Sequence, residues 1–150
     1  MASFTCGGIP HVPASADEVY AHTFPRMVAK THLLYERYPG DERRLALLAD
    51  RVAAGVVRLP DGSPLSPRRL QSLGQGLGMK PGHERLHNLL DLAFTAGDGS
   101  AEAVLAAAGG NAEKVEVSPA FLAGAWEATN VVSNPLYWVL QELIYADGEL

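Results

Sequence analysis

The sequence predicts an all-α protein, a compact bundle of about six helices with one small β-hairpin. Helix-starting signals recur along its 150 residues, and apolar side chains return at helical spacing after most of them. With 47% hydrophobic and 19% charged residues, the composition is that of a globular chain. This length suits a single domain that buries its own core, with residues 1–14 as an extended lead-in.

Two helices are expected in the first third of the chain. The first begins at a capping box opened by Ser15 and should end before Pro39. The second starts at Asp41, presents an apolar stripe and ends at Gly55. Between residues 56 and 66, two very short extended pieces flank a Pro-Asp-Gly turn, and we interpret them as the hairpin.

Three later helices share one start signal, a capping side chain followed by proline at the first helical position. The signal occurs at Ser66-Pro67, Ser118-Pro119 and Asn134-Pro135. A further helix is expected from about His83 to Ala96, after a glycine-rich stretch at residues 74–82 that we interpret as a flexible turn. Residues 101–117 begin as an alanine-rich helix and continue as an acidic connection whose order the sequence leaves open.

Charge and composition argue against several classes of partner. The net charge is −5 and the basic residues are scattered, so we expect no nucleic acid as a partner. Cys6 is the only cysteine, which fits a reducing compartment. Because no stretch approaches eighteen apolar residues, we predict a cytoplasmic protein without membrane association. The glycine-rich stretch lacks the spacing of a dinucleotide or phosphate loop, and we predict no cofactor.

The last expected helix carries the clearest pattern for ligand binding. Trp138, Glu142 and Tyr145 follow one another at i, i+4 and i+7, so they share a helical face. A carboxylate between two aromatic side chains is suited to holding a cation. The alternative is an exposed glutamate beside two aromatic residues of the core.

Residues 83–87 match the H-E-x-x-H pattern of zinc hydrolases. His83 and His87 lie four residues apart, as two zinc ligands on one helical face would. A catalytic site needs a third ligand, and the downstream glutamates lie on segments that the sequence does not place. His83 also directly follows Pro81-Gly82, at a helix start. We therefore predict no metal site, a surface His83 and a half-buried His87, and keep a zinc hydrolase as the weakest alternative.

Several ordered segments, spanning about residues 7–148, resemble the helical cap of actinobacterial-type prolyl aminopeptidases. These enzymes, also called proline iminopeptidases, belong to the α/β-hydrolase superfamily. The segments that carry the resemblance are Tyr35–Pro39, Val57–Gly62, Gly78-Met79 with Glu84–His87, and Asn134–Tyr137 with Gln141–Tyr145. In that family the catalytic serine, aspartate and histidine lie in a flanking hydrolase domain, and the sequence shows no G-x-S-x-G nucleophile motif.

The resemblance implies a role for the acidic face of the last helix. In the family, a cap glutamate followed three residues later by tyrosine binds the free amine of the substrate, and that pattern falls on Glu142 and Tyr145. The spacing argument and the resemblance therefore point to the same acid. By the resemblance, the counterpart of His83 is commonly aromatic and has no metal role.

Two main hypotheses follow for function. The first is a non-catalytic, cap-derived domain that binds a small hydrophobic or amine-bearing molecule or a short peptide, such as a drug-sequestering or resistance-type protein. The second is a substrate-selecting cap fragment of a prolyl aminopeptidase, which needs the missing hydrolase domain; neither is an enzyme on its own. Either would cover its apolar surface with a ligand, a hydrolase domain or a second copy of itself. The expected ligand-binding residues are Glu142, Tyr145, Trp138, Tyr137, Trp126 and Phe121.

Overall fold

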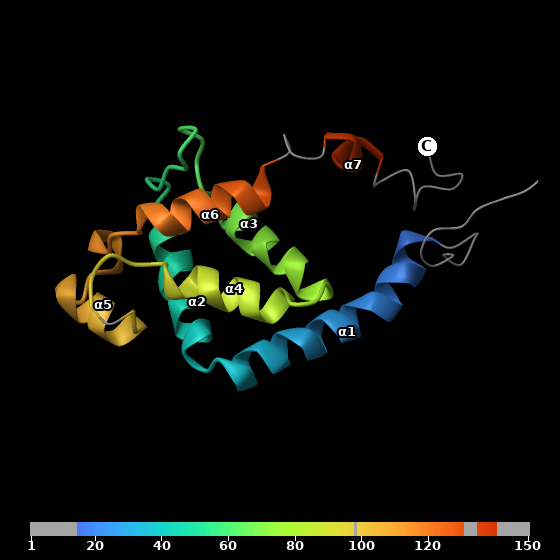
Figure 1. Ribbon diagram of the computed structural model, residues 1–150, viewed down its shortest axis with the longest axis horizontal. Coiled ribbons are helices and arrows are strands. Elements are labelled where there is room, and N and C mark those ends of the chain that lie inside the picture. Colours follow the sequence, from blue (N-terminus) through green and yellow to red (C-terminus); the bar gives the residue numbers. More distant parts are fainter. Residues whose placement is uncertain (1–14, 98, 131–134, 141–150) are drawn as a thin grey trace, which may run out of the picture. The chain divides into compact units, whose positions relative to one another are not determined.

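The computed structural model describes residues 15–97, 99–130 and 135–140, without the side chain of Trp138, and within these ranges it is all-α, as predicted (Figure 1). None of the described helices has the length and apolarity needed to cross a membrane. In chain order the elements, of which two are 3₁₀ helices (η), are α1 (Ala16–Arg37), α2 (Gly40–Ala53), α3 (Pro67–Ser72), η1 (Leu73–Gly78), α4 (Gly82–Asp91), α5 (Ala101–Ala107), η2 (Ala112–Lys114), α6 (Pro119–Thr129) and α7 (Pro135–Leu140).

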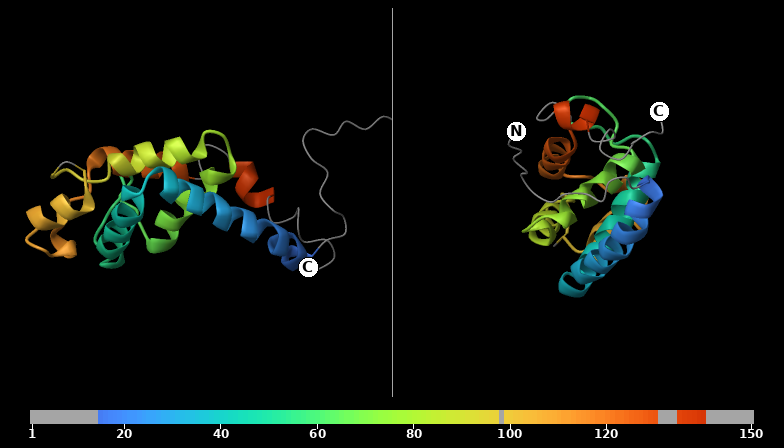
Figure 2. Two further views of the ribbon diagram at one scale, coloured as in Figure 1. Left: turned by 90° about the horizontal axis from the view of Figure 1, so that it is seen from below. Right: turned by 90° about the vertical axis from the view of Figure 1, so that its right-hand side faces the viewer.

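The chain divides into two compact units, and the larger one, residues 27–130, holds the core. The second half of α1 packs there with α2, α3, α4 and α6, whose arrangement Figure 2 shows from two further sides. Leu34 of α1, Leu48 of α2, Leu90 of α4 and Phe121 of α6 are each at most 1% exposed. Burial of such side chains is the main stabilising contribution in a helical unit of this kind. The other unit comprises residues 1–26 and 131–150.

A smaller apolar cluster orders the segment whose structure the sequence left open. Leu47 of α2, Val104 of α5 and Val115 after η2 are buried against one another. An ion pair between Arg43 and Glu102 adds a second link between α2 and α5. Residues 101–117 therefore pack against α2 within the larger unit.

Side-chain caps start the helices where the sequence predicts them. The Ser15 hydroxyl accepts a hydrogen bond from the Glu18 amide at 3.2 Å. The Ser66 hydroxyl accepts one from the Arg69 amide at 3.2 Å, and the Ser118 hydroxyl accepts one from the Phe121 amide at 3.0 Å. Each bond satisfies one of the amides that a helix start leaves without a partner. The cap expected at residue 134 lies outside the described residues.

The predicted β-hairpin at residues 56–66 is not formed. In its place is a loop with one isolated antiparallel bridge, between Arg58 and Pro64, and no strand. The turn itself is present, with Gly62 at φ +80°. Pro60 and Pro64 have no amide hydrogen to donate to a ladder, so the pairing cannot extend into strands.

Two further boundaries differ from the prediction. The glycine-rich stretch is not a flexible turn over its first part, because η1 forms there with Leu73 and Leu77 buried as anchors. α4 ends at Asp91, five residues earlier than Ala96. The chain then leaves the helix so that Phe94 can form an isolated bridge with Val117.

Candidate functional site

The ligand-binding face predicted for the last helix lies mostly outside the described residues. Glu142 and Tyr145 follow the end of α7, and the side chain of Trp138 is not described. Tyr137 lies in α7 with 42% of its surface exposed. The predicted role of this face as an amine-binding site stays a prediction.

The two other predicted ligand-binding residues belong to the core of the larger unit. Phe121 is fully buried, and Trp126 is partly buried against the same core cluster. The Trp126 indole donates a hydrogen bond to the Asp61 carboxylate at 3.0 Å. Two hydrogen bonds from Ser63, with a smaller effect of the Trp126 bond, lower the pKa of Asp61. Both aromatic side chains therefore already have packing partners within the core, and Trp126 also anchors the loop after α2.

The two histidines of the H-E-x-x-H pattern contact different partners. His83 Nε2 lies 2.9 Å from the backbone oxygen of Lys30, and His87 Nδ1 lies 3.0 Å from Asp41. Among the described residues, no group of three histidine, cysteine or acidic side chains is arranged to hold a metal ion. Glu84, between the histidines, pairs with Arg37, and the pKa of its carboxyl is lowered mainly by a hydrogen bond from its own amide.

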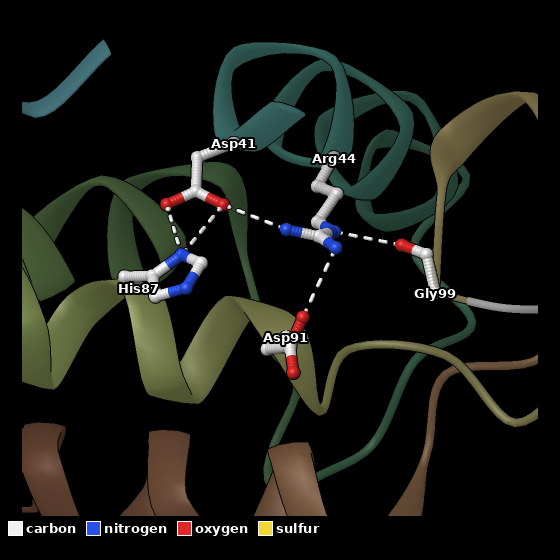
Figure 3. A network of polar contacts seen from close by, with 5 residues as sticks. All are labelled: Asp41, Arg44, His87, Asp91 and Gly99. Atoms are coloured by element: carbon white, nitrogen blue, oxygen red, sulfur yellow. Dashed lines mark hydrogen bonds and ion pairs between the residues drawn. The ribbon is translucent and has the colours of Figure 1, made fainter. Parts of the chain in front are cut away.

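His87 belongs to a buried network of charged groups, drawn in Figure 3. Asp41, at the start of α2, has no exposed surface, and its carboxylate lies 2.9 Å from Arg44 Nη1 and 3.0 Å from His87 Nδ1. Arg44 also contacts Asp91 Oδ1 at 3.0 Å and donates to the Gly99 carbonyl at 2.7 Å. The Arg44 side chain is 13% exposed, so its contacts are largely shielded from water.

This network joins three parts of the larger unit. Asp41 and Arg44 come from α2, His87 and Asp91 from α4, and Gly99 lies just before α5 (Figure 3). A buried carboxylate costs free energy unless it is paired and hydrogen-bonded, and here both partners are present. The ring of Tyr38 stacks on His87 with 3.7 Å between centroids, which fixes the imidazole further. An aspartate–histidine pair orients a base, but the network contains no nucleophile, so we interpret it as a structural brace.

This brace was missed in the sequence analysis because its two central residues had another interpretation. Asp41 served as a helix-start signal, and His87 as half of a zinc motif. Arg44 follows Asp41 at the i+3 spacing of a helical ion pair, which was the one available signal. The pairing with α4 depends on tertiary packing, which the spacing alone does not show.

The larger unit also has an apolar groove, which we define by its lining residues. Its volume is about 420 Å³, within the range of small-molecule pockets. It opens between the second half of α1, α2, α3, η1 and the start of α4. The lining residues, none of them charged, are Thr31, Leu34, Tyr35, Leu45, Ala49, Pro67, Leu70, Gln71, Leu73, Gly74, Leu77 and Leu86.

Tyr35 is the aromatic residue of the groove. Burial is the main cause that raises the pKa of its phenol, and the negative charges of Glu42 and Asp41 raise it further. The Thr31 hydroxyl donates to the Met27 carbonyl at 3.0 Å and is thus already engaged in α1. Tyr35 belongs to the segment Tyr35–Pro39, which carries part of the family resemblance, but no pattern in the sequence indicated a groove beside it.

Comparison with known proteins finds a relationship to a proline iminopeptidase. Of the relatives found, the proline iminopeptidase of Aeromonas sobria is 32% identical over 145 residues, which are 97% of this chain. The chain spans 30% of the length of that protein. No protein-family model and no solved structure matches. The chain is therefore related to the proline iminopeptidases, through a region that is helical in its described parts and corresponds to their cap.

Proposed function

We propose that this chain acts as the substrate-selecting cap of a proline iminopeptidase, an enzyme that releases an N-terminal proline. The relationship to the Aeromonas sobria protein along 97% of the chain carries the proposal. The described residues contribute helices and no β-sheet, as expected of a cap rather than of a hydrolase core. Cleavage then depends on catalytic residues outside the region that this chain matches.

In this proposal the acidic face of the last helix recognises the amine of the substrate. Glu142 accepts the protonated amine of the N-terminal residue, and Tyr145 lies beside it. The paired carboxylate and ammonium form a charge-assisted hydrogen bond, which is stronger than one between neutral groups. The spacing of these residues and the family resemblance support this assignment.

The larger unit would serve as the rigid base of the cap. Its buried leucines and the brace around Asp41 hold α2 and α4 together. A fixed helical framework of this kind is what a cap needs to present a constant surface to its substrates.

A chimeric enzyme tests the proposal. This chain replaces the matching 145 residues of the Aeromonas sobria protein, and hydrolysis of chromogenic substrates with N-terminal proline, alanine or leucine is measured. We expect turnover with a clear preference for proline. A folded chimera whose active-site serine still reacts with an organophosphate, but which shows no preference for proline, would contradict the proposal.

Drug sequestration by a free-standing domain has no specific observation in its favour, and we do not propose it. A zinc hydrolase likewise lacks support, since both histidines of the motif have protein partners within the larger unit.

A further inference from the structure

We propose that the apolar groove of the larger unit binds a small apolar molecule that carries a protonated amine. The site involves none of the residues assigned to the substrate amine, so it goes beyond the proposed cap function. The inference rests on the shape of the groove and on the charges beside it.

Small residues create the space in the groove. Ala49 of α2 and Gly74 of η1 stand where longer side chains would fill it. A Cβ atom placed on Gly74 meets no atom within 4 Å, which shows that the room beside this residue is open. A cavity of about 150 Å³ lined by apolar side chains is enough to bind benzene. A volume of about 420 Å³ therefore suffices for a six-membered ring with a short chain.

Firm apolar walls favour a ligand over collapse of the groove. The buried leucines that line it belong to the main core cluster and are at most 8% exposed, which limits their movement. Binding of an apolar ring against these leucines is favourable because it removes apolar surface of both the ring and the groove from water. These walls are supplied by Leu34, Leu70, Leu73, Leu77 and Leu86.

The charges beside the groove favour a cation at its Tyr35 end. Glu42 precedes the groove residues Leu45 and Ala49 by three and seven positions in α2, so it lies on the helical face that lines the groove. Its charge contributes to the raised pKa of the Tyr35 phenol, and it forms no ion pair with any described residue. The charge of Asp41 acts on the same phenol but is largely offset by Arg44. An ammonium ion at this end gains the attraction of Glu42 and of the Tyr35 ring.

The positively charged side chain of Lys30 lies toward the other end of the groove, beside η1. Lys30 Nζ donates to the carbonyls of Leu77 and Gly78 at 3.3 and 3.1 Å, so it is held beside η1. Lys30 and Tyr35 are five positions apart on α1, a separation of about 7.5 Å along the helix. The apolar body of the ligand therefore points toward Leu77, and its amine toward Tyr35.

Three probes with the same ring test the charge preference. Cyclohexylmethylamine, cyclohexylmethanol and cyclohexanecarboxylate are titrated into the full chain, and amide chemical shifts are followed by NMR. We expect the amine to bind about fivefold more tightly than the alcohol, as an exposed ion pair allows, and the carboxylate to bind least. The largest shifts should fall on the amides of Tyr35 and Gly74.

Matched variants test the location. Ala49→Leu fills the groove and should weaken amine binding at least tenfold, whereas Ala46→Leu, an identical change at a position of the same helix that does not line the groove, should leave it unchanged. Leucine is a good helix former at both positions, and far-UV circular dichroism checks that both variants fold. Glu42→Gln should remove most of the preference for the amine over the alcohol, with the attraction of the Tyr35 ring remaining, and Glu127→Gln on α6 should leave the preference unchanged.

Three results would overturn the proposal. Equal affinity for the three probes would show that the charges have no role. Shifts spread over the chain, without a maximum at the groove, would show that the probes bind elsewhere. Amine binding that survives Ala49→Leu would show that the groove is not the site. None of these results depends on peptidase activity, so the cap proposal is tested separately.

Discussion

Replacing Asp41 with asparagine should destabilise the chain strongly, because this carboxylate is the centre of the buried brace. The substitution keeps the size of the side chain and removes its charge. Arg44 then loses its buried anionic partner, and one oxygen that accepts from His87 becomes an amide nitrogen. The negative charge at the start of α2, which stabilises the helix by its interaction with the helix dipole, is lost as well.

The structure sets the magnitude of this effect. Breaking a buried ion pair by removing one partner costs about 3–5 kcal/mol. Arg44 keeps two contacts, to Asp91 and to the Gly99 carbonyl, so we expect the lower end, about 3 kcal/mol. With a urea m-value of about 1.5 kcal/mol/M for a domain of this size, the unfolding midpoint should fall by about 2 M.

Asp91→Asn is the matched control, since it removes the other carboxylate from the same guanidinium. The Asp91 side chain is 59% exposed, so its pair with Arg44 is partly screened by water and should be worth less than about 1 kcal/mol. Urea unfolding of both variants, followed by far-UV circular dichroism, gives the comparison. A cost below about 1 kcal/mol for Asp41→Asn, or equal costs for the two variants, would refute the role of Asp41 as the centre of the brace.

Two further predictions concern a close backbone approach and an acid titration. Gly82→Ala should cost about 3 kcal/mol, because its Cβ would lie 2.1 Å from a backbone carbonyl oxygen, whereas Gly78→Ala, whose Cβ meets nothing within 4 Å, should cost under about 1 kcal/mol. Thermal unfolding measures both, and equal costs would show that the packing at Gly82 is looser than described. The lowered pKa of Asp61 means that its stabilising contribution is present above the unfolded value of 3.8 and is lost as pH falls through the folded value. In a Trp138→Phe background, the indole N–H resonance of Trp126 should therefore titrate below pH 3.8; a midpoint at or above that value would contradict the assignment.

Local signals predicted the helices well because their causes are local. The serine caps at Ser66 and Ser118 act within three residues, and each is followed by a proline that fits the first helical turn. The hairpin prediction was wrong because a turn signal says where a chain reverses, not whether the flanking residues can pair. Pro60 and Pro64 remove donors that strands would need.

The candidate sites were harder to predict because they combine distant segments. Asp41 and His87 are 46 positions apart, and only the packing of α2 on α4 brings them together. The groove depends on small residues, such as Ala49 and Gly74, whose importance is the space that they leave. A pattern of residue types does not report empty space. The predicted amine-binding face, in contrast, depends only on the spacing of residues within one helix, which a sequence shows directly.

The most direct test of the cap proposal is to measure how much Glu142 contributes to substrate recognition. Kinetic constants for a proline-terminated chromogenic substrate are measured in the chimera with Glu142→Gln and, as a control, Glu127→Gln on the exposed surface of α6. Loss of a charge-assisted hydrogen bond to the substrate amine should lower kcat/KM about 10- to 100-fold, mainly through KM, while the control stays unchanged. Equal kcat/KM in both variants would contradict the account.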